Sequence, residues 1–502
     1  MIILYCLISL LLLSTTVYSA TTLTSNDDTI EIHLLGLNDF HGQLNTHQNI
    51  LGQKVGGAEY VSAYINKFRK QYENTLLVHS GDMVGGSPPL SALFHDEPTI
   101  DFLNYLNVDV GTPGNHEFDE GVQEMFRLVE GNNDGAFPGS TATYISANVI
   151  DNKSNSPLLP PYTIKEINGV KLGFIGAVTT ETNNFVIPQN RQEITISDEV
   201  EAINLATENL IDQGVHSIIV LAHISAKSNL KGGNPQLDTV KMAPLLHDEV
   251  DVIFAGHSHG HANTVVDNKL IVQGYAYGKA ISDVKIKINP QNGQIVNKEA
   301  DIHLTFHSLI NPDQTVVNLL TLYEKKLSRQ TKEIISSIPH DLSRKKNSKG
   351  QSALGSMIVS AMREKTNSDI AFLHHGGIRF SLNKGNITLE DIYRSLPFNH
   401  KLVKMQLTGQ QMINILNQQW THEKENLLQS SGISYQMTHT ENKIIELKDS
   451  IGEEIDPDRI YTVVTSDYLA YGGDGFSAFK SGEVIFTGET IRDIFIDYLK
   501  KR

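Results

Sequence analysis

Five short polar motifs contain the residues of this 502-residue chain whose types are suited to chemistry. They are Asn38-Asp39-Phe40-His41-Gly42, Gly81-Asp82, Gly114-Asn115-His116-Glu117-Phe118-Asp119, His223 and Gly256-His257-Ser258-His259. Carboxylate, amide and imidazole groups supply the oxygen and nitrogen ligands that divalent metals take in proteins. Each motif alone is more typical of a turn, a helix cap or a hydrogen-bonded core histidine. Because every motif follows an apolar run, we interpret them together as one metal site.

Asp39 and His41 are separated by one residue, so an extended backbone would place both side chains on the same face, where they could bind one ion. A second ion nearby would be repelled unless a shared carboxylate offset the charge, and Asp82 is the candidate for that bridge. Two metals roughly 3.5–4 Å apart activate water as hydroxide and hold a phosphoryl group. The residue types therefore favour a hydrolase of phosphate esters, with Zn, Mn, Co or Fe as equally suitable ions.

These motifs need a scaffold that brings distant segments together, and the hydropathy pattern predicts one. Apolar runs of strand length end at the motifs, and stretches with helical spacing separate them. The expected strands are 30–37, 75–79, 108–112, 171–178, 217–222 and 252–255, and the expected helices are 56–70, 100–106 and 200–213. This alternation predicts an α/β fold, in which ligands gather beyond the carboxyl ends of the strands.

A change of pattern after residue 270 divides the chain. Short alternating segments over 270–288 are typical of antiparallel strands that finish a first domain, and 312–332 has the apolar spacing of a helix. Beyond it we expect helices at 354–362 and 409–420 and strands at 369–373 and 460–466. The predicted organisation is a metal-binding domain over 20–310, a connecting helix over 311–335 and a second, α+β domain over 336–502.

Residues 1–19 form an almost unbroken apolar run, which is typical of a secretory signal peptide cleaved before Ala20. The run has no Lys or Arg at its start, so an uncleaved N-terminal anchor is the alternative. The only cysteine, Cys6, lies in this run, so a mature chain would have no disulfide and no thiolate ligand. The C-terminal residues carry no hydrophobic tail for a lipid anchor. We expect an exported protein, periplasmic or extracellular, without a stable membrane anchor.

The chain is acidic, with a formal net charge of -16 at pH 7. This charge repels nucleic-acid backbones and anionic membranes, so we expect no extended nucleic acid as a partner. Small anionic substrates remain compatible, because bound cations reverse the local field. No motif predicts a protein partner.

The five motifs resemble those of the calcineurin-like metallophosphoesterases. With Gly376-Gly377-Ile378-Arg379 and Gly472-Gly473-Asp474-Gly475-Phe476, the chain resembles the secreted 5'-nucleotidase and UDP-sugar hydrolase family over nearly its whole mature length. The resemblance implies a metallophosphoesterase β-sandwich flanked by helices, a connecting helix, and a C-terminal α+β domain that recognises the substrate. It also implies that rotation of the second domain brings the substrate to the metals.

The resemblance assigns roles around the metals residue by residue. It implies that Asp39, His41, Asp82 and His259 hold one ion and that Asp82, Asn115, His223 and His257 hold the other. His116 and Asp119 resemble the family's catalytic pair, in which a charged imidazole stabilises the phosphoryl group or the leaving oxygen while the carboxylate orients the ring. Some relatives that act on cyclic phosphates and 3'-nucleotides have Asn in place of Asp119, so the Asp favours 5'-nucleotides. For Glu117 and Phe118 we expect packing or solvent contact.

The resemblance places the substrate-binding residues in the second domain. Phe398 and Tyr468 match two aromatic residues that stack on a nucleobase, with core packing as the alternative for both. Asp474 and Arg379 match residues around the ribose and the substrate anion. Arg344 lies in the segment where the family has further arginines.

The chain departs from the family at His374-His375, where relatives have Asn and a third glycine, and at Ser356, where they have Asn. These departures affect the preferred nucleotide. We expect an exported enzyme with two divalent metals that cleaves nucleoside 5'-monophosphates, and also di- and triphosphates, to nucleoside and phosphate. The alternatives are a UDP-sugar or dinucleotide pyrophosphatase, a 2',3'-cyclic phosphodiesterase or 3'-nucleotidase, and an inactive secreted nucleotide-binding protein.

Overall fold

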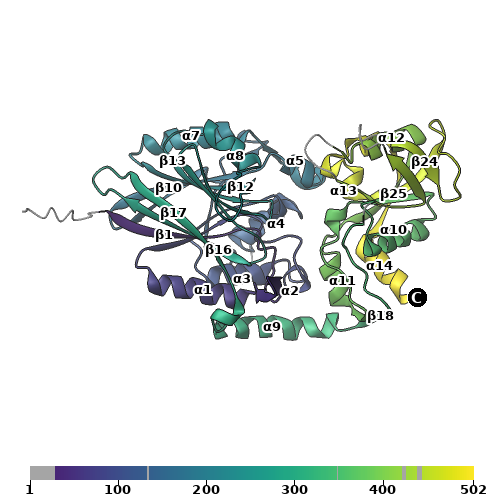
Figure 1. The fold of residues 1–502 in the computed structure, drawn as a ribbon, viewed down its shortest axis with the longest axis horizontal. Helices are drawn as coiled ribbons and strands as arrows, with labels where there is room; N and C mark the ends of the chain where they lie inside the picture. Colours follow the sequence, from purple (N-terminus) through teal and green to yellow (C-terminus); the bar gives the residue numbers. More distant parts are fainter. Residues whose placement is uncertain (1–28, 133–134, 348, 421–425, 438–443) are drawn as a thin grey trace, which may run out of the picture.

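The computed structural model describes residues 29–132, 135–347, 349–420, 426–437 and 444–502. The expected signal segment, residues 1–19, lies outside these ranges. Two domains lie side by side, and helix α9 (Gln314–Thr331) runs along one side of the molecule from the first domain to the second (Figure 1). Within the described ranges, no helix has both the length and the apolar character needed to cross a membrane.

The first domain contains two six-stranded sheets. Across the first sheet the strands are β17 (Ile295–Leu304), β16 (Ala280–Ile288), β1 (Ile30–Leu37), β4 (Thr75–Ser80), β5 (Val110–Thr112) and β6 (Thr143–Tyr144). Strands β1, β4, β5 and β6 are parallel, whereas β16 and β17 are antiparallel to their neighbours. The parallel strands therefore end at one edge of the sheet.

The second sheet also contains four parallel strands. Its strands are β14 (His261–Val266), β15 (Lys269–Gly274), β13 (Val250–Gly256), β12 (Ser217–Ser225), β10 (Val170–Val178) and β9 (Tyr162–Ile167), in that order. The four central strands are parallel, and the two outer strands are antiparallel to them. Strands β15 and β16 follow each other in the chain but belong to different sheets, so the expectation of one antiparallel group over 270–288 was wrong.

Apolar side chains from the two sheets pack face to face and form the central core. They include Ile32 and Val78 from the first sheet and Phe174, Leu221 and Phe254 from the second, and burial of each such side chain contributes about 1.5–3 kcal/mol. Helices α1 (Ala58–Gln71), α3 (Glu97–Tyr105) and α9 cover the outer face of the first sheet, and α7 (Glu199–Ile211) and α8 (Asp238–Met242) cover that of the second. This confirms the predicted α/β sandwich flanked by helices.

The second domain is built on a five-stranded sheet. Its strands are β22 (Gln429–Ser431), β19 (Ile370–Leu373), β25 (Ile460–Ser466), β21 (Lys401–Thr408) and β26 (Glu483–Thr490). One face packs against α10 (Ala353–Thr366) and α14 (Ile491–Lys500), and the other against α12 (Gly409–Asn417). The mixed sheet with helices on both faces agrees with the predicted α+β domain.

The connecting helix ends earlier than the expected range of 311–335. After α9, residues Ile334–Ile338 form β18, which pairs with β20 (Gly385–Thr388) of the second domain. The reason is local: Ile335 and Ile338 are buried in the core of the second domain, and a helix continued from α9 would carry them away from it.

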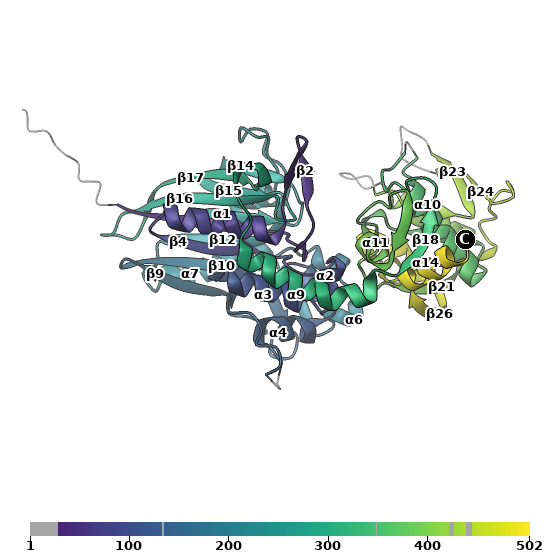
Figure 2. The same ribbon diagram turned by 90° about the horizontal axis from the view of Figure 1, so that it is seen from below.

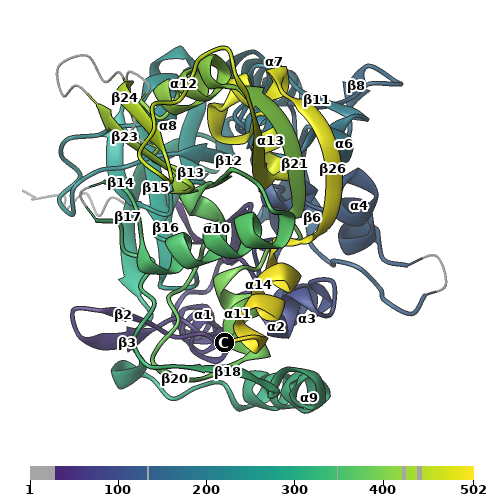
Figure 3. The ribbon, with the colours of Figure 1, turned by 90° about the vertical axis from the view of Figure 1, so that its right-hand side faces the viewer.

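Seen from the side of the second domain, this domain lies in front of the first (Figure 3). Its residues Phe398 and Asn399 contact His116 and Glu120, which follow the end of the parallel strand β5. A hairpin formed by β2 (Gln48–Ile50) and β3 (Gln53–Val55) projects from the first domain on the side of the second domain (Figure 2). The fold thus places the predicted motifs between the two domains.

Candidate metal centre and catalytic cleft

The predicted metal ligands meet at the common edge of the two sheets. The first sheet supplies Asp39 and His41 after β1, Asp82 after β4 and Asn115 after β5. The second sheet supplies His223 near the end of β12, and His257 and His259 after β13. The structure brings all seven side chains together. The α/β scaffold therefore gathers residues that are up to 220 positions apart, since residue 39 lies beside residue 259.

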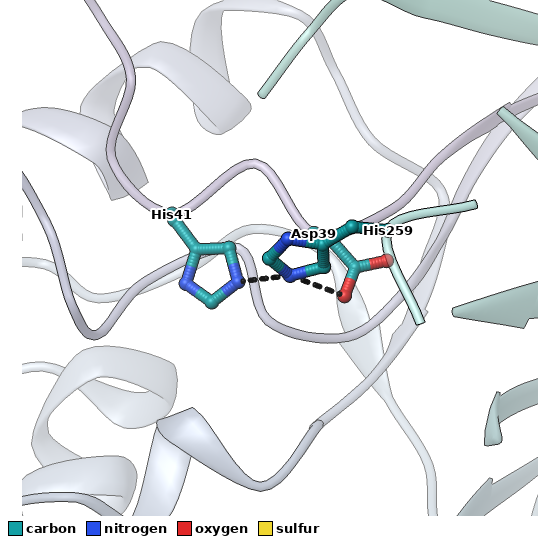
Figure 4. Close-up of side chains that lie close together, drawn as sticks. All are labelled: Asp39, His41 and His259. Atoms are coloured by element: carbon teal, nitrogen blue, oxygen red, sulfur yellow. Dashed lines mark hydrogen bonds and ion pairs between the residues drawn. The ribbon is translucent and has the colours of Figure 1, made fainter. Parts of the chain in front are cut away.

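Asp39, His41 and His259 form the first group of candidate ligands (Figure 4). The Nε2 atoms of His41 and His259 are 3.1 Å apart, and His259 Nε2 is 3.4 Å from Asp39 Oδ1. His41 Nδ1 donates a hydrogen bond to the backbone carbonyl of Gly85 at 2.8 Å, so the lone pair of its Nε2 points into the group. Two imidazoles and a carboxylate that converge in this way suit a divalent cation.

The second group contains Asn115, His223 and His257. Asn115 Oδ1 lies 2.9 Å from His257 Nδ1 and 3.2 Å from His223 Nε2. His223 Nδ1 donates to the backbone carbonyl of Ser80 at 2.8 Å, which turns Nε2 towards the group. The group thus presents an amide oxygen and two imidazole nitrogens to one point.

Asp82 lies between the two groups. Its Oδ2 is 3.1 Å from His223 Nε2 in the second group and 3.6 Å from His41 Nε2 in the first. Its Oδ1 accepts the backbone N–H of His116 at 2.9 Å, which fixes the orientation of the carboxylate. One carboxylate oxygen therefore faces both groups, as a shared ligand requires.

Burial governs the protonation of these groups. It raises the pKa of Asp39 to about 7 and lowers the pKa of His41 to about 3. Burial also opposes the charged form of His223, but Asp82 outweighs this effect and raises the pKa of His223 to about 9. These neighbouring carboxylates and imidazoles therefore differ strongly in their affinity for a proton. A divalent metal would replace the shared protons, because it binds the deprotonated forms of both groups.

Most of the predicted ligands adopt a left-handed backbone conformation. The φ angles are 49° for Asp39 and for His41, 52° for Asp82, 70° for His257 and 55° for His259. Residues other than glycine rarely adopt such angles, because Cβ crowds the neighbouring carbonyl. The expectation that Asp39 and His41 share an extended strand face was wrong: a tight turn after β1 aims both side chains at the same point.

Glu117, for which we expected only packing or solvent contact, joins two of the ligand-bearing segments. Its buried carboxylate accepts the backbone N–H groups of Asp82 at 2.9 Å, Met83 at 2.8 Å and Gly114 at 2.5 Å. Burial, reinforced by Asp82, raises the pKa of Glu117 to about 7. These bonds tie the turn after β4 to the turn after β5, so Glu117 sets the distance between Asp82 and Asn115.

His116 and Asp119 lie beside the metal centre. His116 Nδ1 is 2.7 Å from Asp119 Oδ2, and the His116 ring is 5.0 Å from that of His41, centroid to centroid. Burial alone would lower the pKa of His116, but Asp119 and Asp82 raise it above its usual value. From the second domain, the ring of Phe398 stacks on His116 with centroids 5.7 Å apart. The pair that we expected to be catalytic therefore lies where the two domains meet.

A cavity of about 610 Å³ is lined by residues of both domains. It is lined by Arg344, Arg379 and Arg394 of the second domain and by His259 of the first. The Arg379 guanidinium lies 5.1 Å from the centroid of the Phe398 ring. The two predicted arginines thus share a cavity with a third, Arg394, which the sequence motifs gave no reason to select.

A second cavity, of about 650 Å³, also has a lining from both domains. It is lined by His116, Asp119 and Phe398, and also by Phe185 and Asn190 from the segment after β10. This segment contains no motif with recognisable chemistry, so neither residue could be predicted from the sequence. The Phe185 ring lies 5.2 Å from that of the predicted ligand His257.

Tyr468 is less accessible than its expected role requires. Its side chain is 6% exposed, and its hydroxyl donates to Asp474 Oδ1 at 2.6 Å. The rings of His374 and His400 lie against it, with centroids 4.6 Å and 5.3 Å away. The structure therefore brings Tyr468 and Asp474 together but leaves no open face of the Tyr468 ring.

Comparisons with known proteins agree with this geometry. Residues 32–261 match the calcineurin-like phosphoesterase family, and residues 329–481 match the 5'-nucleotidase C-terminal domain. The chain is 34% identical over 461 residues to Endonuclease YhcR of Bacillus subtilis, and the aligned region covers 89% of this chain but only 38% of that protein. It is 32% identical over 541 residues to Cell wall protein Lmo0130 of Listeria monocytogenes, and the aligned region covers 96% of this chain and 68% of that protein.

A solved structure shows the same arrangement of domains. The 5'-nucleotidase precursor from Thermus thermophilus aligns with a TM-score of 0.81 at 25% identity, over 94% of this chain and 96% of that chain. Both matched domains thus occur in this chain in the same order, and the converging donors lie at the edge where the first domain faces the second. The chain belongs to the 5'-nucleotidase family of metal-dependent phosphoester hydrolases with a calcineurin-like phosphoesterase domain.

Proposed function

We propose that the chain hydrolyses nucleoside 5'-monophosphates, releasing nucleoside and phosphate, with two divalent ions bound in the first domain. The observation that carries this proposal is the position of Asp82, one oxygen of which faces both groups of ligands. Asp39, His41 and His259 would hold one ion, and Asn115, His223 and His257 the other. Such ions act as Lewis acids on phosphoryl oxygens and lower the pKa of water.

His116 and Asp119 act on the leaving group in this proposal. Asp119 accepts the Nδ1 proton of His116, which leaves Nε2 free to face the substrate. A charged His116 donates a hydrogen bond to the oxygen on which negative charge develops as the ester bond breaks. The raised pKa of His116 supports this role, because it favours the charged imidazole.

The second domain selects the substrate. Arg344 and Arg379 have no carboxylate partner among the ion pairs of the described residues, and both face the cavity next to His259. We assign them to the anionic part of the substrate, with Asp474 near the ribose and Phe398 as a stacking surface for the base. Tyr468 would complete the stack.

A second candidate is a pyrophosphatase that cleaves nucleotide sugars or dinucleotides. The specific observation in its favour is that Phe398 lines a cavity of about 650 Å³ and Arg379, which contacts the Phe398 ring, lines another of about 610 Å³. A substrate with two bulky halves could place one in each cavity. No comparable observation favours cyclic phosphodiesterase or 3'-nucleotidase activity, or nucleotide binding without hydrolysis.

We also propose that the protein is exported to the periplasm or the cell exterior. The apolar composition of residues 1–19 supports this, as does the similarity to a protein that is named a cell wall protein.

A substrate panel tests the function directly. Metal-stripped protein reconstituted with Zn²⁺, Mn²⁺ or Co²⁺ is expected to release phosphate fastest from nucleoside 5'-monophosphates, more slowly from nucleotide sugars and 3'-nucleotides. Asp82→Ala is expected to lower turnover at least about 10³-fold with each ion while the protein remains folded by circular dichroism. Near-normal turnover in folded Asp82→Ala would contradict the shared-ligand role, and faster cleavage of UDP-sugars would favour the second candidate.

A further inference from the structure

A third ring, that of His400, lies between the two aromatic residues that we expected to stack on a base. Its centroid is 5.1 Å from that of Phe398 and 5.3 Å from that of Tyr468, and it is tilted by 34° to each. Both distances are within the range of aromatic contacts in protein cores. His400 thus makes, with Phe398 and Tyr468, the contacts that a planar base held between them would make.

His400 separates the ring of Tyr468 from the cavity next to His116. Phe398, His400 and Asp467 line the cavity of about 650 Å³, whereas Tyr468 is not among the described residues that line it. The His400 side chain is 21% exposed and Tyr468 is 6% exposed. His400 therefore stands between the cavity and the ring of Tyr468.

The anchor that holds His400 in this position is weak. His400 Nδ1 is 3.3 Å from Asp467 Oδ1, a long distance for a charge-assisted hydrogen bond. The same oxygen accepts the backbone N–H of Tyr468 at 2.8 Å, so it is already engaged. Besides Phe398 and Tyr468, the His400 ring contacts the ring of His374, whose centroid is 5.3 Å away. A partly exposed side chain held by one long hydrogen bond and by ring contacts can change rotamer on a timescale far shorter than turnover.

We propose that His400 is a specificity-determining gate, whose imidazole closes the space between Phe398 and Tyr468 and turns aside for a substrate with a planar base. The proposal rests on the nucleotide hydrolysis proposed above. A base that enters the space regains the aromatic contacts that His400 gives up, so its entry is nearly balanced in free energy. A phosphate ester without a ring reaches the first domain without moving His400 and gains nothing from the two aromatic residues.

The test compares His400→Ala with the wild-type enzyme, both loaded with metal, on adenosine 5'-monophosphate and on glycerol 2-phosphate. Removal of the imidazole opens the space, so kcat/KM for the nucleotide is expected to rise about fivefold, through a lower KM. For glycerol 2-phosphate, kcat/KM is expected to stay within about twofold of the wild-type value. His400→Phe, which keeps a ring in the space, is expected to lower nucleotide use. His340→Ala, an exposed histidine of the same domain, is the matched control and is expected to change neither substrate.

Calorimetric titration with adenosine, which has no phosphate, measures the gate independently of hydrolysis. His400→Ala, and His400→Asn as a second opening variant, are expected to bind adenosine more tightly than the wild type. Weaker binding would overturn the proposal, because His400 would then contact the base directly, and unchanged binding would overturn it too. A wild-type enzyme that released no phosphate from any nucleotide would refute the proposed function, while the adenosine titration would still decide whether His400 is a gate.

Discussion

At the scale of single residues, Glu117 shows how a side chain without chemistry of its own positions those that react. Its carboxylate accepts backbone N–H groups from the turns after β4 and β5, and those turns contain Asp82 and Asn115. A glutamine has the same shape but only one oxygen, so its amide N–H groups would face some of these donors. In Glu117→Gln, an amide N–H therefore faces a backbone N–H at a buried position, where the wild type has a hydrogen bond.

We expect Glu117→Gln to weaken metal binding about tenfold or more, because the two turns lose their common anchor. The free energy of unfolding of the metal-free protein is expected to fall by about 1–3 kcal/mol, the cost of a buried donor without a partner. Competition with a chromophoric chelator measures the first effect, and urea denaturation the second. Glu130→Gln, at an exposed position at the end of α4 (Val122–Glu130), is the matched control. Wild-type metal affinity in Glu117→Gln would contradict the positioning role.

The candidate ligands could be predicted from the sequence, but Glu117 and His400 could not. Asp39, Asp82 and His257 each follow an apolar run, and parallel strands must end at one edge of their sheet, so their convergence follows from topology. The three partners of Glu117 are backbone N–H groups, two of them, those of Asp82 and Met83, more than 30 positions away, and backbone groups have no side-chain signature. The position of the His400 ring depends on how β21 meets α13 (Asp467–Ala470), and spacing does not reveal it.

At the scale of elements, the sequence predicted the central strands because they are buried on both faces and read as continuous apolar runs. The sequence did not predict which of the two sheets each strand joins. Strands β15 and β16 have similar local patterns, yet β15 extends the second sheet and β16 the first. The chain crosses between the sheets through Tyr275 and Tyr277, which both have left-handed φ angles, of 59° and 63°. No local pattern distinguishes such a crossover from an ordinary hairpin.

At the scale of the whole molecule, contacts across the cleft hold the domains together over the metal centre. Asn399 Nδ2 donates to Glu120 Oε1 at 3.2 Å, and the Phe398 ring lies 3.1 Å from the position that a side chain on Gly86 would occupy. The nearby α5 (Thr182–Phe185) contacts the Gly473–Gly475 segment of the second domain. We expect a substrate that binds between Phe398 and the first domain to enter before these contacts form, so we expect turnover to require separation of the domains.

A cross-link between the domains tests this requirement. Residues 20–502 contain no cysteine, so in protein produced from Ala20 onwards Cys introduced at Glu120 and Asn399 can be joined selectively by a short bismaleimide. We expect the cross-linked enzyme to lose at least about tenfold in kcat, because product cannot leave a closed cleft. The same double variant treated with a monofunctional maleimide controls for the bulk of the reagent. Full activity after complete cross-linking would show that the domains do not need to move.

The left-handed turns of the metal centre have a consequence for how the protein resists heat. Each non-glycine residue in this conformation costs about 1 kcal/mol, so Asp39, His41, Asp82, His257 and His259 together form a reserve of strain in the first domain. Glycine adopts the same angles without that cost. His259→Gly should therefore melt, in metal-free form, at a higher temperature than His259→Ala, which loses the same imidazole contacts but keeps a Cβ at the left-handed angle. A lower melting temperature for His259→Gly than for His259→Ala would contradict the strain. The wild type is expected to gain more than His259→Gly from added metal, because His259 is one of the candidate ligands and an ion that binds only the folded state raises its stability.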